Sequence, residues 1–238
     1  MNTDLFARLS GTLLPHGLIV RGAFRPEAAD LAGTDLQAGT VSKLVLIGNA
    51  GVAMWRAFEP FIDSDDNPLD RWTRRIVDPV ADQARARAIY PFDDPPPPIQ
   101  RWAMGAEQLR PSPLGILIHP QYGLWHAYRA VLVFKDNVES EHEELESTRE
   151  ETPAHPCDSC AEKPCLTACP VDAFSTAGYD IPACAEFLAG TEGGSCLRAG
   201  CQARNACPVG PEWRYDDAQI AFHMAAFARA VTTRGPAG

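Results

Sequence analysis

Eight cysteines, all confined to one stretch, constrain this chain more than any other feature of its sequence. They lie between Cys157 and Cys207, and the preceding 156 residues of the 238-residue chain contain none. In a reducing compartment thiols do not persist as disulfides, so cysteines kept there in such number are expected to bind metal. The uneven distribution predicts two modules, with the metal chemistry in the second.

The spacing of the cysteines narrows the kind of metal site. The first four follow the pattern C-x2-C-x4-C-x3-C-P, and the others are Cys184 alone and then Cys196-x4-Cys201-x5-Cys207-Pro. Closely spaced thiolates wrap one iron–sulfur cluster, and a cysteine that precedes proline reaches across to a second cluster. Two Cys-Pro pairs therefore predict two [4Fe–4S] clusters, although the four-residue gap departs from the bacterial pattern. Four-thiolate zinc sites, redox-active or buried thiols, and one cluster with four spare cysteines are the alternatives.

Charge and hydropathy exclude several classes of partner. The formal net charge is −10, from 31 acidic and 21 basic residues, which argues against a broad surface for nucleic acid or anionic membrane. The N-terminus lacks the basic and apolar regions of a signal peptide, and the longest apolar stretch, 44–55, is too short to span a bilayer. We expect a cytoplasmic protein without a membrane partner.

The boundaries of the modules follow from an acidic tract. Residues 138–151 carry seven glutamates, with Pro153 and Pro156 close behind. Such a tract is typical of a solvated linker, and docking of a redox partner protein is the alternative. The sequence therefore predicts a domain over 1–137, a linker over 138–156, and a domain over 157–238 that closes with a helix at 216–231.

The first domain shows the alternation of an α+β fold. Apolar runs predict strands at 18–20, 43–47, 114–118 and 130–134, and a helix at 52–59 follows the turn at 48–51. That turn lacks the full G-x-G-x-x-G pattern, so a tight turn is favoured over a phosphate site. A second helix is expected to start with Asn67 as its cap and to end or kink at Pro79. The second domain is expected to be loop-rich, with a short helix at 183–188.

A histidine and several aromatic residues form a second candidate site. The turn between the last two strands of the first domain contains His119, Tyr122, Trp125 and His126. These side chains could line a pocket for a large planar ligand, or they could be ordinary core packing.

The cysteine pattern resembles the two-cluster, ferredoxin-type domain of the epoxyqueuosine reductases and the corrinoid reductive dehalogenases. In those families a lone cysteine on a helix lies between the two runs, as Cys184 does here. The resemblance implies a bacterial ferredoxin-like domain and two ligand sets. One set is Cys157, Cys160, Cys165 and Cys207, and the other is Cys169, Cys184, Cys196 and Cys201.

The aromatic segment is similar to the H-P-x-[FY]-G-x-W-x-x-[IY]-R motif of the CblC-type cobalamin-processing proteins. The matching residues are His119, Pro120, Tyr122, Gly123, Trp125 and Arg129, whereas Leu124 and Ala130 depart from the family pattern. The resemblance implies a nitroreductase-like fold with a corrinoid pocket. It implies binding roles for His119, Tyr122, Gly123, Trp125 and Arg129. A flavin is suggested only by analogy with the fold.

The two resemblances together imply an iron–sulfur oxidoreductase that passes single electrons through its clusters to a bound corrinoid, in which the cofactor carries the chemistry and the protein positions it. The alternatives are a ferredoxin-like carrier without corrinoid and a cobalamin-trafficking protein. A role on RNA is not expected, because the chain is acidic and shows no basic tract.

Overall fold

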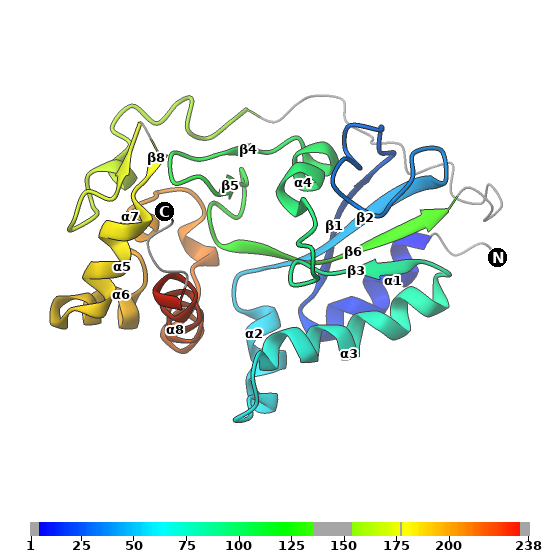
Figure 1. Cartoon of the computed structure of the whole chain (residues 1–238), viewed down its shortest axis with the longest axis horizontal. Helices are drawn as coiled ribbons and strands as arrows, with labels where there is room; N and C mark the ends of the chain where they lie inside the picture. Colours follow the sequence, from blue (N-terminus) through cyan, green and yellow to red (C-terminus); the bar gives the residue numbers. More distant parts are fainter. Residues whose placement is uncertain (1–4, 136–153, 177, 234–238) are drawn as a thin grey trace. The chain divides into compact units, whose positions relative to one another are not determined.

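The computed structural model describes residues 5–135, 154–176 and 178–233, and these divide into two compact units (Figure 1). The first unit contains the described residues up to Leu109 together with those from His126 onward to residue 135. The second contains Arg110–Trp125 and the described residues from Ala154 onward. The acidic tract at 138–151 lies outside the described residues.

The first unit is built on a four-stranded antiparallel sheet in the order β1-β2-β6-β3. Its strands are β1 (Ile19–Phe24), β2 (Val41–Ala50), β3 (Arg87–Ile89) and β6 (His126–Lys135), and its helices are α1 (Leu5–Leu13), α2 (Ala53–Phe58), α3 (Pro68–Gln83) and α4 (Ile99–Glu107). Short 3-10 turns lie at Leu14–His16 and Glu59–Phe61.

The central strands β2 and β6 hold the core of the first unit. They pair along their whole length, with Leu46 opposite Val131 and Val45 opposite Leu132, and these four side chains are at most 2% exposed. Helix α4 covers one side of the sheet and α1 and α3 cover the other (Figure 1). Strands of a sheet that is covered on both faces are expected to be continuously apolar. The sequences of β2 and β6 both show this pattern.

Helix α3 differs from the expectation in two details. Asn67 precedes it with a left-handed backbone (φ 53°) and makes no side-chain cap. Pro79 lies inside the helix, which continues to Gln83, so of the two expected outcomes the helix does not end there. Proline removes one backbone hydrogen bond, and the burial of Val77 and Val80 on either side of it keeps the helix intact.

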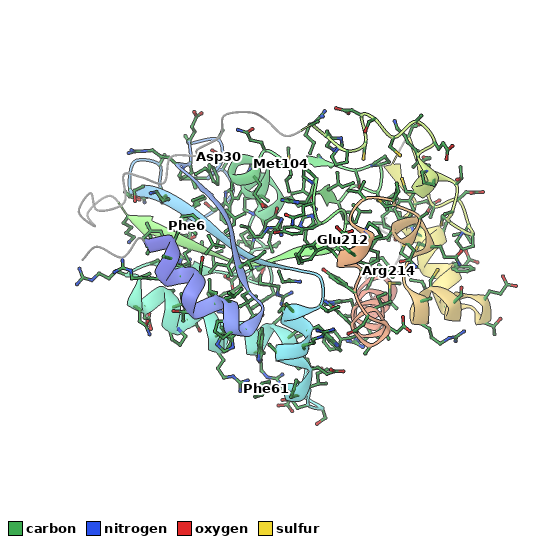
Figure 2. All side chains as sticks on the ribbon, turned by 180° about the vertical axis from the view of Figure 1, so that it is seen from behind. Phe6, Asp30, Phe61, Met104, Glu212 and Arg214 are labelled. Carbon is green, nitrogen blue, oxygen red and sulfur yellow. The ribbon has the colours of Figure 1, made fainter. Side chains whose placement is uncertain are left out.

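Four large apolar side chains on the described part of the first unit remain exposed: Leu14, Phe61, Ile62 and Met104. Phe61 follows α2 and Met104 lies on α4 (Figure 2), and they are 52% and 41% exposed. The guanidinium of Arg75 lies 4.7 Å from the centre of the Phe61 ring, so this ring is partly covered by a cation.

The second unit consists of short elements joined by loops. Its strands are β4 (Arg110–Pro111), β5 (Leu117–Ile118), β7 (Phe174–Ser175) and β8 (Gly178–Tyr179), its 3-10 turns are η4 (Pro164–Leu166), η5 (Thr191–Gly193) and η6 (Pro211–Trp213), and its helices are α5 (Ile181–Ala189), α6 (Gly194–Ala199), α7 (Gln202–Asn205) and α8 (Asp217–Thr233). Asp180 caps α5 by accepting from the backbone N–H of Ala183 at 2.9 Å. The helices expected at 183–188 and 216–231 are present with bounds that differ by one or two residues.

The segment Arg110–Trp125 groups with the second unit, although the expected boundary assigned it to the first domain. Its side chains Leu114, Ile118 and Leu124 are buried in one apolar cluster with Cys165 and Phe174. The strand expected at 114–118 is reduced to two residues, because the backbone turns at Gly115 (φ 76°).

The α+β prediction is confirmed as a mixture of helices and antiparallel strands. The ferredoxin-type assignment of the second unit stays a prediction. Among the described residues, no helix combines the length and the apolar character needed to cross a bilayer.

Candidate functional site

The eight cysteines are free thiols of the second unit, and they line two separate cavities, four in each. The small cavity, about 20 Å³, is lined by Cys157, Cys160, Cys165 and Cys207. The large cavity, about 440 Å³, is lined by Cys169, Cys184, Cys196 and Cys201. The resemblance to two-cluster domains divides the cysteines into the same two groups, whose role as ligands stays a prediction.

Electrostatic effects between the thiols stay within each set among the described residues. Burial raises the pKa of Cys157 to about 11, and the neighbouring thiols of Cys207, Cys165 and Cys160 raise it further. In the large cavity burial raises the pKa of Cys184, with smaller effects from the thiols of its own set. Each set is therefore a cluster of buried or half-buried cysteines whose sulfurs would repel one another as thiolates unless a cation held them.

Hydrogen-bond donors point at several of these sulfurs. The backbone N–H of Ala173 donates to Cys169 Sγ at 3.4 Å, and the backbone N–H of Val209 donates to Cys207. The hydroxyl of Tyr179 donates to Cys184, which opposes the rise in the pKa of that thiol. Such donors stabilise thiolate and tune the potential of sulfur-ligated iron, so the surroundings of the sulfurs fit an iron–sulfur cluster.

The cysteines were also candidates for a site that binds a single metal ion. Within residues 5–135, 154–176 and 178–233, no three or more histidine, cysteine, aspartate or glutamate side chains form a group that could hold one metal ion. Zinc needs four donors within about 2.3 Å of one point. The four thiols of the large cavity surround about 440 Å³, which is room for a group larger than a single ion.

The segment Arg110–Trp125 forms a wall of both cavities. Ser112, Pro113, Ile118 and Leu124 line the small cavity, and Leu114, Gly115 and Ile116 line the large one. The Arg110 guanidinium bonds the Asp158 carboxylate at 2.5 Å and holds the pKa of that carboxyl below its usual value. Because Asp158 lies between Cys157 and Cys160, this ion pair ties the segment to the first cysteine loop.

Gly123 lies where the segment Arg110–Trp125 contacts the loop after Cys207. Its φ is 56°, and a Cβ atom there would lie 1.9 Å from the carbonyl oxygen of Val209. Gly210 has the reciprocal constraint, because its Cβ would lie 2.6 Å from the carbonyl oxygen of Gln121. The two backbones touch, so both positions require glycine.

His119 and Tyr122 stack on each other beside this contact, with ring centres 4.2 Å apart. The Nδ1 atom of His119 accepts from the backbone N–H groups of Gln121 and Tyr122 at 3.0 and 3.2 Å. A nitrogen that accepts carries no hydrogen, so these contacts assign the hydrogen of the neutral ring to Nε2. His119 therefore presents a donor rather than a lone pair at Nε2.

The structure does not bring together all five residues for which the resemblance to CblC implies a binding role. Trp125 is 2% exposed, and its ring packs against Tyr215 at 5.4 Å. Arg129 belongs to the first unit, where its Nη2 bonds the Asp70 carboxylate at 3.0 Å and the Thr73 hydroxyl at 3.3 Å. His119, Tyr122 and Gly123 thus form one group, while Trp125 and Arg129 have structural partners of their own.

A buried polar network in the first unit was missed from the sequence. The Arg21 guanidinium bonds the Glu107 carboxylate at 3.0 Å, with side-chain exposures of 1% and 9%, and Glu107 also accepts from the Tyr128 hydroxyl. Arg21 Nη1 contacts His126 Nδ1 at 3.2 Å. Because guanidinium can only donate, His126 Nδ1 accepts. The only signal in the sequence is one arginine within an apolar strand.

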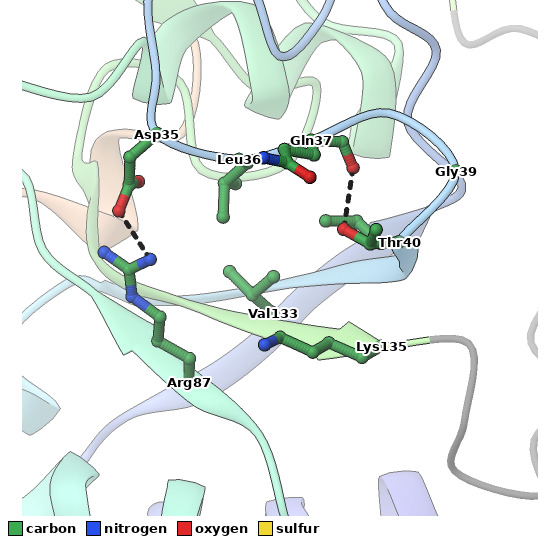
Figure 3. Close-up of a pocket in the computed structure, with 9 residues that line it drawn as sticks. Asp35, Leu36, Gln37, Gly39, Thr40, Arg87, Val133 and Lys135 are labelled. Carbon is green, nitrogen blue, oxygen red and sulfur yellow. Dashed lines mark hydrogen bonds and ion pairs between the residues drawn. The ribbon is translucent and has the colours of Figure 1, made fainter.

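A hollow on the first unit holds none of the expected site residues. It encloses about 580 Å³ and lies between the loop at 35–40 and the ends of β3 and β6 (Figure 3). Arg87 and Asp35 form an ion pair of 2.7 Å at its edge, and Thr40 donates to the carbonyl of Gln37 at 2.9 Å. Both ionic groups are more than half exposed, so this hollow is a solvated surface feature.

Comparison with known proteins gives one clear result at the level of fold. No family model and no curated protein matches the chain. The B12-trafficking protein CblC of C. elegans aligns with a TM-score of 0.53 at 15% identity, over 95% of this chain and 94% of that one. The chain has the CblC fold.

Two structures of epoxyqueuosine reductase also align with the chain. The protein from Bacillus subtilis gives a TM-score of 0.49 at 12% identity, over 88% of this chain and 67% of the reductase. A selenomethionine-labelled epoxyqueuosine reductase gives 0.46 at 14% identity, over 74% and 51%. The chain thus spans about half the length of the second reductase.

Proposed function

We propose that this protein is an iron–sulfur oxidoreductase that binds two [4Fe–4S] clusters in its second unit and a corrinoid. The observation that carries the proposal is the division of the eight thiols into two sets of four around separate cavities. When bound, the clusters would supply one-electron transfer. The free thiols suit a reducing compartment, so we place the protein in the cytoplasm.

The residues of the chain have distinct tasks in this proposal. The cysteines bind iron, and the backbone donors at Ala173 and Val209 stabilise the sulfur charge. The apolar walls supplied by Leu114 and Ile118 keep water from the sulfurs. A redox partner protein would deliver the electrons.

Iron content tests the two sets separately. We expect anaerobic reconstitution with iron and sulfide to give about eight irons per chain. Cys160→Ser and Cys184→Ser each remove one ligand of a different set, so each should leave about four. Ser159→Ala, next to Cys160 in the same loop, is the control and should keep all eight. A full iron content in either cysteine variant, or tight zinc binding without visible absorbance, would contradict the proposal.

The corrinoid part of the proposal is supported by the CblC fold and by the donor at Nε2 of His119. We propose that His119 donates a hydrogen bond to the corrinoid rather than ligating cobalt, because its Nε2 carries the hydrogen.

Titration with hydroxocobalamin, followed by its visible spectrum, tests this assignment. His119→Ala should weaken binding about tenfold, the worth of one hydrogen bond of about 1.4 kcal/mol. His16→Ala, in the 3-10 turn Leu14–His16 of the first unit, is the control and should bind as the unchanged protein does. Equal affinity in the His119 variant would assign that side chain to packing, and no binding at all would favour a ferredoxin-like carrier.

A further inference from the structure

Arg204 places a positive charge in the wall of the large cavity. It lies on α7 between Cys201 and Cys207, and it lines the cavity together with the four thiols. Its Nη2 donates to the carbonyl of Leu124 at 2.6 Å. The guanidinium lies over two rings, 4.3 Å from the centre of Trp125 and 4.9 Å from that of Tyr215.

The charge of Arg204 is not neutralised within the part of the chain that the structure describes. Its partners there are one backbone carbonyl and two aromatic rings, and its Nε atom is buried without a hydrogen-bond partner. Arginine stays protonated at every accessible pH. The large cavity therefore has a permanent cation in its wall that water screens only in part.

Arg204 also fixes the geometry of the thiol next to it. Its backbone N–H donates to the sulfur of Cys201, while its side chain holds the end of the segment Arg110–Trp125 through Leu124 and Trp125. One residue thus connects the sulfur, the cavity and the segment that walls it.

Among the described residues that line the small cavity, no arginine takes the place that Arg204 has in the large one. The basic residue that lines the small cavity is Lys163, whose side chain is exposed, so solvent screens its charge. The two thiol sets differ in the electrostatic field that each would impose on a bound group.

We propose that Arg204 is a positioning residue that raises the reduction potential of the cluster held by Cys169, Cys184, Cys196 and Cys201, so that this cluster is reduced before the other one. The inference rests on the proposed function. An added electron increases the negative charge in the cavity, and a fixed cation close by stabilises the reduced form. Lys163, in water, does this weakly for the other set.

The test is a redox titration of the reconstituted full chain, in which dithionite supplies one electron to each cluster and EPR follows the fraction reduced. Arg204→Gln and Arg204→Met remove the charge, and the methionine variant keeps an unbranched apolar chain against Trp125 and Tyr215. For the cluster in the large cavity, both variants should lower the equilibrium constant for reduction at least tenfold, which is about 59 mV for one electron. The cluster in the small cavity should keep its reduction potential. Its EPR signal is identified because it is the one that Cys160→Ser loses.

Two further variants separate charge from shape. Arg204→Lys keeps the charge, so the reduction potential of the cluster in the large cavity should stay close to that of the unchanged protein. Arg198→Gln makes the same change of net charge at an exposed position of α6 between Cys196 and Cys201, and it should leave the potential unchanged.

The outcomes are distinguishable from a failure of the proposed function. If the unchanged chain binds no iron, the proposed function fails. If Arg204→Gln or Arg204→Met binds eight irons and the potential of the cluster in the large cavity is unchanged, the role of the charge is overturned. The role is also overturned if Arg204→Lys lowers that potential as much as the uncharged variants do. If both uncharged variants lose four irons while Arg204→Lys keeps eight, the residue serves assembly and the proposal about potential is also overturned.

Discussion

Gly123 matches a motif of a cobalamin-processing family, yet its geometry is explained by contact between two backbones. Its φ of 56° and the 1.9 Å that would separate a Cβ from the Val209 oxygen leave room for hydrogen alone. Val209 follows Cys207 by two residues, so this contact positions the last cysteine loop. A motif residue can thus be required by packing and still sit beside a functional site.

Gly123→Ala should destabilise the second unit by about 3 kcal/mol or more, because the new methyl group adds overlap to an unfavourable φ. Gly115→Ala is the matched control: its φ is 76°, but nothing lies within 4 Å of its Cβ position. The control should cost about 1–2 kcal/mol from the backbone alone. Urea unfolding of both variants measures the difference, and equal losses would show that the Val209 contact is unimportant.

Strand β1, helix α4 and strand β6 are joined by one buried ion pair and its neighbours. Arg21 comes from β1, Glu107 from the end of α4, and Tyr128 and His126 from β6. Gly22 lets β1 approach α4, because a Cβ there would lie 2.9 Å from the Ala106 oxygen. The pair and its hydrogen bonds therefore connect β1, α4 and β6 in the core of the first unit.

Glu107→Gln should cost about 3–5 kcal/mol of stability, because it leaves the Arg21 charge buried without its carboxylate. Asp35→Asn removes the carboxylate of the exposed Arg87 pair and should cost no more than about 1 kcal/mol. Chemical denaturation of both variants, followed by far-UV circular dichroism, tests the contrast. A loss at Glu107 as small as that at Asp35 would mean that water reaches the network.

Helix α3 and segment 114–118 show where local patterns mislead. Pro79 is a helix breaker by its chemistry, but the apolar side chains around it are buried and hold α3 in one piece. The run at 114–118 has the composition of a strand, but Gly115 turns it so that Leu114 and Ile118 both face the cysteine loops. In both places tertiary burial outweighs local preference.

The second unit is discontinuous in the chain, and this has a consequence for the whole molecule. Its apolar cluster takes Leu114, Ile118 and Leu124 from a segment that precedes the cysteines by over thirty residues. Residues 154–238 alone would expose the other half of that cluster to water.

We therefore expect a chain of residues 154–238 to bind less iron and to unfold more readily than the intact protein. A chain in which residues 110–125 are joined to residue 154 by a flexible Gly/Ser linker should recover both properties. Iron analysis and thermal unfolding of the two chains measure this. Full iron binding by 154–238 alone would show that the segment is dispensable.

Sequence alone was sufficient for the features that depend on residue type and spacing: the cysteine-rich second half, the apolar strands at 43–47 and 130–134, and the helices flanking them. These features depend on the types and spacing of residues that are close together in the sequence. Only the tertiary structure decided that the thiols line two cavities, that residues 110–125 wall both of them, that Arg21 is a buried cation and that Arg204 lies in the wall of the large cavity. Those features depend on contacts between residues far apart in sequence, and no local pattern records which distant backbone will cover a given side chain.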